Sequence, residues 1–163
     1  MNLVLFNMSN LVDWQSGVVN RNFFIVQQLL KSNKFDQIVL VDFLAIQSIK
    51  KIFGKQRTYA YAKWCLNQGY TKIGPVHGAK KISAEDLFDV KTEFHHIAGI
   101  GLARSASKVL QEIQAYLGKE GIKLEETVIW NYNAFLPQAH ELPAKQTVFD
   151  TVDNWSEHAS YKK

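Results

Sequence analysis

Short uninterrupted apolar runs, alternating with segments of helical period, constrain the fold of this chain most. The first run covers residues 3–8 and the second is centred on residues 38–42. Such runs are typical of strands buried on both faces, as in a parallel sheet. Between them, residues 21–34 place apolar side chains at helical spacing, and Asn20 can cap the start of that helix. Strand, helix and strand in this order predict a right-handed βαβ unit.

The second half of the chain repeats this alternation. Residues 105–121 predict the clearest helix, with one apolar stripe that starts at Val109. Strands are predicted for residues 92–100, 126–133 and 146–153, with a short turn-helix in between at 137–143. The sequence therefore predicts a single α/β domain over residues 1–163, with a Rossmann-like, open, doubly wound and mostly parallel sheet.

The middle of the chain is the part that the pattern describes least. Residues 45–53 suggest a short helix or turn, and residues 57–66 fit a strand or a helix equally well. Breakers interrupt the stretch after residue 71, at Gly74-Pro75 and Gly78. We expect this region to add to the sheet, with a β-hairpin beside the strand at residues 92–100.

Composition narrows the class of protein. The chain has 163 residues, a net charge of +4 and a single cysteine, Cys65, which excludes an internal disulfide. Cys65 is expected to be a buried thiol, with a catalytic nucleophile as the alternative. The dense basic stripe of a nucleic-acid-binding protein is absent. Neither a signal-peptide pattern nor a membrane-length apolar run occurs, so we expect a cytoplasmic protein.

Ligands of open α/β sheets bind beyond the carboxyl ends of the strands. That rule selects the segment 7–17 after the first strand, then Asn131, Tyr132 and Asn133, and finally the segment 150–153. Because parallel strands end at the same edge, we expect these three segments to lie together.

Two candidate features arise in these segments. Ser16-Gly17 and the start of the first helix could present backbone N–H groups to an anion, with Arg21 as a bidentate partner; a surface loop with an exposed arginine is the alternative. Asp150 and Asp153 could serve as a general base or as metal ligands. The competing interpretation, favoured by spacing alone, is that Asp153 caps a following helix.

Two further motifs are weaker candidates for a functional site. The sequence GIGLAR, residues 99–104, resembles a dinucleotide fingerprint, but Arg104 stands where a small residue is required for close helix–strand packing. A plain glycine turn before a helix is the preferred interpretation, with an anion contact as the alternative. Neighbouring His95 and His96 point to opposite faces of a strand, so they cannot easily share one metal, and we predict structural roles for both.

Taken in order, several segments resemble bacterial family-4-type glycosyltransferases. Trp14, Arg21 and the strand at residues 38–42 are similar to the opening of that family. The sequence VIWNYNAFLP, residues 128–137, resembles its lWvynP strand, and TVFDTVDNW, residues 147–155, resembles its vYDcvDdW motif. The chain departs from the family pattern at Asn22, where a proline is common, and at Asn154, where the second acidic residue of DDW stands.

The resemblance implies half of a GT-B fold, in which two Rossmann-like domains face each other across a cleft. This chain matches the N-terminal, acceptor-side domain, so a donor-binding C-terminal domain is expected to be missing and the chain to be truncated before it. Asp150 and Asp153 would lie near the reacting sugar as the catalytic residues. The substrate-binding residues would be Ser16, Gly17, Arg21, Asn131 and Asn133.

The implied activity is transfer of a sugar from a nucleotide-diphosphate donor to a hydroxyl of a saccharide or lipid-linked acceptor, in surface-polysaccharide biosynthesis. No metal or cofactor is expected, no nucleic acid partner, and peripheral contact with the inner membrane face is compatible with the mild positive charge. The fragment alone is expected to be inactive. The alternative is a non-catalytic Rossmann-like module that binds a saccharide or nucleotide.

Overall fold

The computed structural model describes residues 1–42, 55–101, 103 and 105–150. Their elements follow in the order β1 (Asn2–Phe6), α1 (Leu11–Gln15), α2 (Arg21–Ser32), β2 (Ile38–Val41), α3 (Lys55–Asn67), β3 (Thr71–Lys72), β4 (His77–Ser83), α4 (Glu85–Phe88), β5 (Glu93–Gly99), α5 (Ala106–Lys119), η2 (Leu124–Glu126), β6 (Thr127–Asn131), η3 (Pro137–Glu141) and β7 (Gln146–Phe149). The predicted segment 45–53 and Asp153 lie outside the described residues.

The strands form one seven-stranded sheet in the order β3-β4-β5-β2-β1-β6-β7. β5, β2, β1, β6 and β7 run parallel to one another, whereas β4 pairs antiparallel with both β5 and β3. The predicted α/β, mostly parallel sheet is thereby confirmed, and its arrangement is consistent with a Rossmann-like fold. The sheet is mixed because the antiparallel hairpin of β3 and β4 extends one edge beside β5. The hairpin expected next to the strand at residues 92–100 is thereby confirmed.

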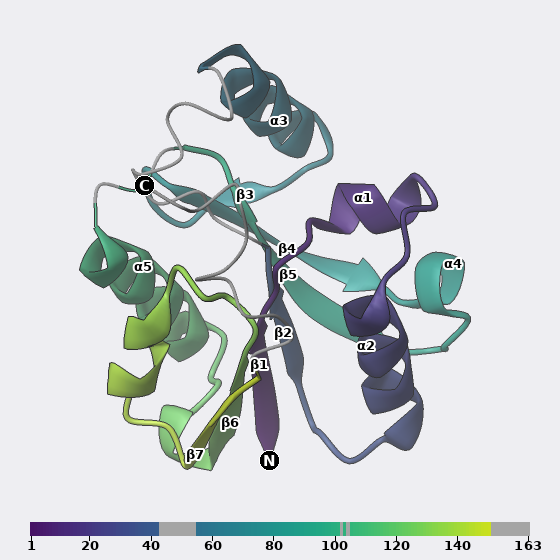
Figure 1. Cartoon of the computed structure of the whole chain (residues 1–163), viewed down its shortest axis with the longest axis vertical. Helices are drawn as coiled ribbons and strands as arrows, with labels where there is room; N and C mark the ends of the chain where they lie inside the picture. Colours follow the sequence, from purple (N-terminus) through teal and green to yellow (C-terminus); the bar gives the residue numbers. More distant parts are fainter. Residues whose placement is uncertain (43–54, 102, 104, 151–163) are drawn as a thin grey trace, which may run out of the picture.

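Helices cover both faces of the sheet. Figure 1 shows α1, α2 and α4 on one side and α5 on the other. The core on the α2 side contains Leu5, Leu40 and Phe88, and the core on the α5 side contains Val4, Val39 and Ile113. Alternate residues of β1 and β2 thus serve opposite cores, which explains why these strands are continuously apolar.

The helices form where their apolar stripes and caps predict them. In α2, the Asn20 side chain accepts a hydrogen bond from the backbone N–H of Phe23 at 3.2 Å, and a left-handed Asn33 follows the last turn. In α5, Ser105 accepts from the N–H of Lys108, and the stripe that starts at Val109 faces the sheet. Both caps satisfy backbone donors that a helix start leaves open.

Two elements settle what the sequence left open. Residues 57–66 belong to helix α3, whose Cys65 is fully buried against Tyr70 and Ala98. Burial raises the pKa of the Cys65 thiol to about 12. The expected buried thiol is therefore confirmed, because a nucleophilic cysteine needs a lowered pKa.

The short helix α1 lies in a segment that the sequence indicated only as a loop.

Candidate functional site

A row of four side chains lies just beyond the carboxyl ends of four neighbouring strands. Its members each follow the last paired residue of β2, β1, β6 and β7, and they are, in the order of the strands, Asp42, Asn7, Tyr132 and Asp150. The backbone N–H groups of Asn7, Tyr132 and Asp150 donate to carbonyls of the adjacent strands at 2.8, 2.9 and 3.0 Å. These bonds continue the parallel ladders by one residue, so the four residues, here called the carboxyl-edge row, lie side by side.

All four side chains of the carboxyl-edge row belong to the face covered by α1 and α2. Tyr132 packs into the core on that side, and Asp42 accepts a hydrogen bond from the N–H of Leu11 at the start of α1. Asp150 contacts Arg21 of α2. Asn7 follows Phe6, whose side chain lies in the opposite core, so strand alternation places Asn7 on the α2 side as well.

The middle of this row coincides with the point where the strand order reverses. From β1 the chain proceeds to β2 and β5 on one side, and later to β6 and β7 on the other. Open α/β sheets bind ligands in the crevice at such a switch point. Asn7 and Tyr132 follow the two strands that border it.

Asp42, at one end of the row, is buried and fully paired. Its Oδ1 accepts from the N–H of Leu11 at 3.0 Å and from Nε2 of His96 at 2.8 Å, and its Oδ2 accepts from the hydroxyl of Tyr61. Tyr70 in turn hydrogen-bonds Nδ1 of His96. Burial and the Asp42 charge raise the pKa of Tyr61 and of Tyr70. This network ties α1 and α3 to the sheet.

Asp150, at the other end, forms a bidentate ion pair with Arg21. Nη1 and Nη2 of Arg21 lie 3.2 and 3.1 Å from Oδ1 and Oδ2 of Asp150. The Asp150 side chain is 18% exposed and that of Arg21 is 53% exposed. The hydrogen bond to Asp150 raises the pKa of Arg21. Both carboxylate oxygens are engaged, so this geometry suits orientation of a ligand better than proton abstraction.

The two asparagines after β6 shape the loop that follows. Nδ2 of Asn131 donates to the carbonyl of Leu136 at 2.9 Å, and its Oδ1 accepts from the N–H of Asn133 at 2.8 Å. Asn133 Oδ1 accepts from the N–H of Phe135 at 2.9 Å. Asn131 lines a cavity of about 310 Å³ with Pro137. It therefore lies on the η3 side of the sheet, opposite the carboxyl-edge row.

Ser16 and Gly17 form the exposed turn after α1. The N–H of Ser16 donates to the carbonyl of Val12 at 3.0 Å, and the N–H of Gly17 donates to that of Trp14 at 3.0 Å. Gly17 has a φ of +89°, a left-handed conformation that favours glycine. Among the described residues that the sequence selected for binding or catalysis, the structure therefore joins Arg21 with Asp150 across the sheet edge, and Asn131 with Asn133 within one loop; Ser16 and Gly17 stay apart from both pairs in their own turn.

The two neighbouring histidines serve opposite faces, as predicted. Nδ1 and Nε2 of His95 lie 2.7 and 2.8 Å from the Tyr116 hydroxyl and Gln37 Oε1, respectively, on the side of α5. His96 lies on the other face, with Asp42. Within the described residues no group of three or more His, Cys, Asp or Glu side chains is arranged to hold a metal ion.

His77 and Glu112 form a buried pair that no motif in the sequence indicated. Nδ1 of His77 donates to Oε2 of Glu112 at 2.9 Å, and that oxygen also accepts from the N–H of Val76 at 3.2 Å. A methyl group at Gly74 would collide with the Glu112 side chain, so that glycine permits the close approach. The spacing of 35 residues between the partners gives no local signal.

We expect His77 to make the protein acid-sensitive. Burial lowers the pKa of His77 below its ordinary value of 6.5, although Glu112 opposes that shift. Between the two pKa values the unfolded chain binds more protons, so the free energy of unfolding falls as the pH drops below about 6.5, by at most about 1.4 kcal/mol per pH unit for one proton. Urea unfolding at pH 7.5 and 5.5 measures this loss.

His77→Gln should reduce the pH dependence in this comparison, because one titrating group is removed; burial also lowers the pKa of His95, which accounts for a remaining part of the dependence. His140→Gln is the matched control: His140 is exposed, and its replacement should leave the dependence on pH as it is in the wild type. A His77→Gln variant with the wild-type loss between pH 7.5 and 5.5 would show that another group is responsible.

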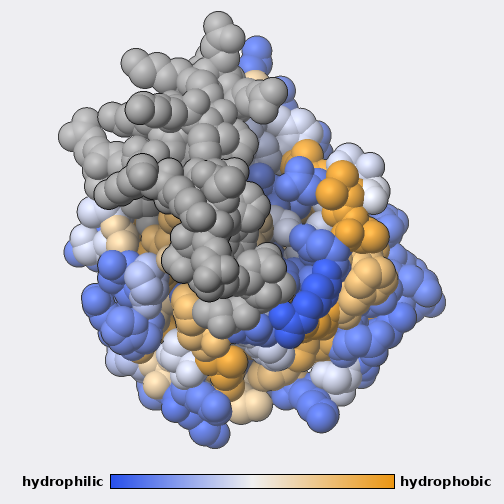
Figure 2. All heavy atoms as spheres, in the orientation of Figure 1, coloured by the Kyte–Doolittle hydropathy of each residue, from blue (hydrophilic) through white to orange (hydrophobic). Residues whose placement is uncertain are grey.

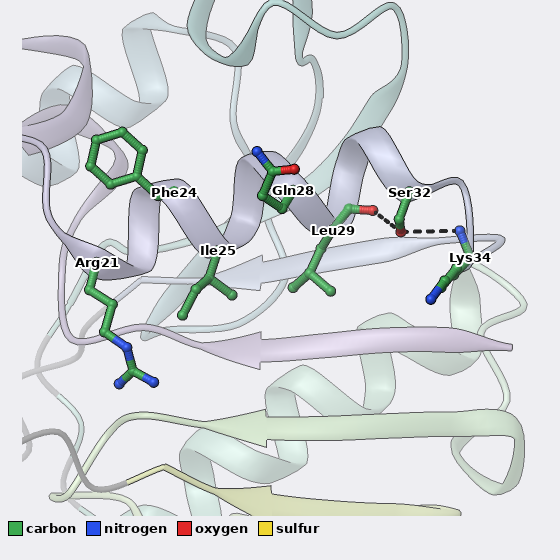
Figure 3. A pocket seen from close by; sticks show the side chains of 7 residues that line it. All are labelled: Arg21, Phe24, Ile25, Gln28, Leu29, Ser32 and Lys34. Carbon is green, nitrogen blue, oxygen red and sulfur yellow. Dashed lines mark hydrogen bonds between the residues drawn. The ribbon is translucent and has the colours of Figure 1, made fainter.

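An apolar groove runs along the flank of α2 and begins at the carboxyl edge. It has a volume of about 440 Å³ and is lined by residues that include Arg21, Ile25, Leu29 and Lys34. Figure 3 shows Arg21 near the carboxyl ends of the strands and Lys34 near the other end, with Ile25 and Leu29 pointing toward the sheet. Figure 2 shows hydrophobic surface on this side of the molecule.

Comparisons of the chain with protein-family models, with curated proteins and with solved structures found no match. None of the helices in the described ranges is long and apolar enough to cross a membrane.

Proposed function

We propose that this chain is the acceptor-side domain of a glycosyltransferase of the GT-B architecture, and that the carboxyl-edge row is its saccharide site. The whole protein would move a sugar from a nucleotide-diphosphate donor to a hydroxyl of a saccharide or lipid-linked acceptor. A second domain would supply most of the donor site, so the present chain by itself should bind a saccharide without turning over a nucleotide sugar.

The contact between Arg21 and Asp150 carries this proposal. These residues belong to two motifs that resemble the family, and they are 129 residues apart in the sequence. Their side chains nevertheless meet at the end of the carboxyl-edge row, where a ligand of an open α/β sheet binds. The groove beside Arg21 gives further support, because an apolar surface at this place is expected where another part of a two-domain enzyme packs.

A binding module without transferase activity is the second candidate. The bidentate geometry favours it, because Arg21 engages both oxygens of Asp150 and so opposes a role for this carboxylate as a general base. The two candidates share the saccharide site and differ in whether a second domain completes the chemistry.

The saccharide site is tested by titrating the ¹⁵N-labelled chain with methyl glycosides of neutral hexoses and following amide chemical shifts. We expect at least one glycoside to shift the amides around Asp150. Arg21→Ala should weaken its affinity about tenfold, equivalent to about 1.4 kcal/mol, because Asp150 loses the partner that orients it.

Lys81→Ala is the matched control for this titration. Lys81 also forms an ion pair, with Glu93 at 3.2 Å, but on the exposed surface of β4 and β5. Its removal should leave the affinity unchanged. The proposal fails if no glycoside shifts any amide near the carboxyl-edge row, or if both variants weaken binding equally.

A further inference from the structure

We infer that Asn7 and Tyr132 form a pair that binds one hydroxyl group of the ligand at the switch point between β1 and β6. This inference rests on the proposed saccharide site and assigns the two residues that select the ligand's functional group. The sequence placed both residues among the candidate positions at the carboxyl ends of the strands but assigned neither of them a role in binding.

The backbone places the two side chains next to each other. Tyr132 extends β6, and its N–H donates to the carbonyl of Phe6 at 2.9 Å, directly before Asn7. Both residues lie on the α2 side of the sheet. They are almost completely buried, with 1% of Asn7 and 2% of Tyr132 exposed.

Both side chains keep an unused polar atom. Oδ1 of Asn7 and the hydroxyl of Tyr132 have no hydrogen-bond partner among the described residues. Buried polar groups without partners cost free energy, and the great majority in native proteins are paired. Asp42 and Asp150, the other members of the row, are fully paired. Among the four members of the row, the unpaired buried atoms thus belong to the two central positions, where the strand order reverses. Other described residues also hold unpaired buried atoms, among them Nε1 of Trp130, which stacks on Tyr132, and Nε1 of Trp14.

The chemistry of the two atoms selects a hydroxyl. The Asn7 oxygen only accepts, whereas the Tyr132 hydroxyl donates or accepts. A single ligand hydroxyl can donate to Asn7 and at the same time accept from Tyr132. A fully ionised phosphate has no proton to donate to the Asn7 oxygen.

The surroundings of Tyr132 fit a sugar ring as the bearer of that hydroxyl. Trp130 stacks on Tyr132, with ring centroids 5.8 Å apart and an angle of 21° between the planes. The Trp130 side chain is half-buried and packs against the core on the α2 side. Asp150 and Arg21 lie close enough to influence the pKa of Tyr132, which burial raises to about 12. The phenol therefore stays protonated at neutral pH and remains able to donate.

The test compares the best-binding methyl glycoside with its monodeoxy analogues in wild type and in Tyr132→Phe. We expect wild type to bind the parent glycoside at least tenfold more tightly than one of the deoxy analogues. Tyr132→Phe should weaken the parent at least tenfold and bind that deoxy analogue as wild type does. Asn7→Leu, which replaces the amide by an apolar side chain of similar size, should remove the same preference.

Stability separates this binding role from a structural one. Because the Tyr132 hydroxyl has no partner in the free protein, Tyr132→Phe should unfold at the same urea concentration as wild type or at a higher one. The matched control is Tyr116→Phe, which removes a hydroxyl that is hydrogen-bonded to His95. That variant should unfold at lower urea and keep the wild-type affinity.

The outcomes show separately whether this inference fails and whether the proposed saccharide site, on which it rests, fails. If a glycoside binds and depends on Arg21, but Tyr132→Phe keeps both affinity and hydroxyl preference, the saccharide site stands and the pairing is wrong. If inorganic phosphate shifts the amides of Asn7 and Tyr132 and no glycoside does, both are wrong, because the edge then binds an anion.

Discussion

Replacement of Asp42 by alanine is expected to lower the free energy of unfolding by about 3–5 kcal/mol, because each hydrogen-bond donor that is left without a partner inside the protein costs about 1–3 kcal/mol. Asp42 is 2% exposed. Its carboxylate accepts three hydrogen bonds, from the N–H of Leu11, from His96 and from Tyr61. Alanine leaves all three donors without this partner, and two of them, the N–H of Leu11 and Nε2 of His96, are buried. Urea unfolding followed by far-ultraviolet circular dichroism measures the loss.

Two further variants show whether unpaired donors are the cause. Glu93→Ala breaks the exposed ion pair with Lys81 and should cost about 0–1 kcal/mol, as is usual at a surface. Combining Asp42→Ala with His96→Leu removes the stranded imidazole and should recover part of the stability. A loss below 1 kcal/mol for Asp42→Ala would contradict the role assigned to this network.

The second large effect is expected at Phe88, at the end of α4. Its ring is fully buried and lies 5.9 Å from that of Trp14, 5.1 Å from Phe23 and 5.8 Å from Phe94. These contacts join α1, α2 and β5 around one aromatic side chain. Phe88→Ala should therefore lower the free energy of unfolding by about 3–5 kcal/mol, through lost burial and the cavity left behind.

Phe24→Ala is the matched control for Phe88→Ala. The side chain of Phe24 belongs to the same helix as Phe23 but is 55% exposed, so its removal should cost less than about 1 kcal/mol. Thermal and urea unfolding of both variants tests the difference. Equal losses would mean that the aromatic cluster under α4 does not hold α2, and with it Arg21, against the sheet.

The elements that the sequence predicted well carry their own local signal. The apolar run at residues 38–42 and the capped, amphipathic segment that begins after Asn20 appear as β2 and α2. The sequence signal is weaker for elements that form mainly because they pair with distant residues. β4 contains Gly78, Lys80 and Lys81, which are poor strand formers, and it is held by seven paired positions with β5. The five residues of α1 are too few to show a helical period.

What the sequence by itself determined is the fold class, the places of most strands and helices, and the edge at which polar residues gather. Side-chain period and capping reflect neighbours two to four residues away, and such contacts can be predicted from the order of the residues. The tertiary structure alone decided which polar side chains meet. Strand register aligned Asn7 with Tyr132, and folding brought Arg21 to Asp150 across 129 residues of sequence. Register and such distant contacts depend on the packing of the whole sheet, for which no short stretch of sequence carries a signal.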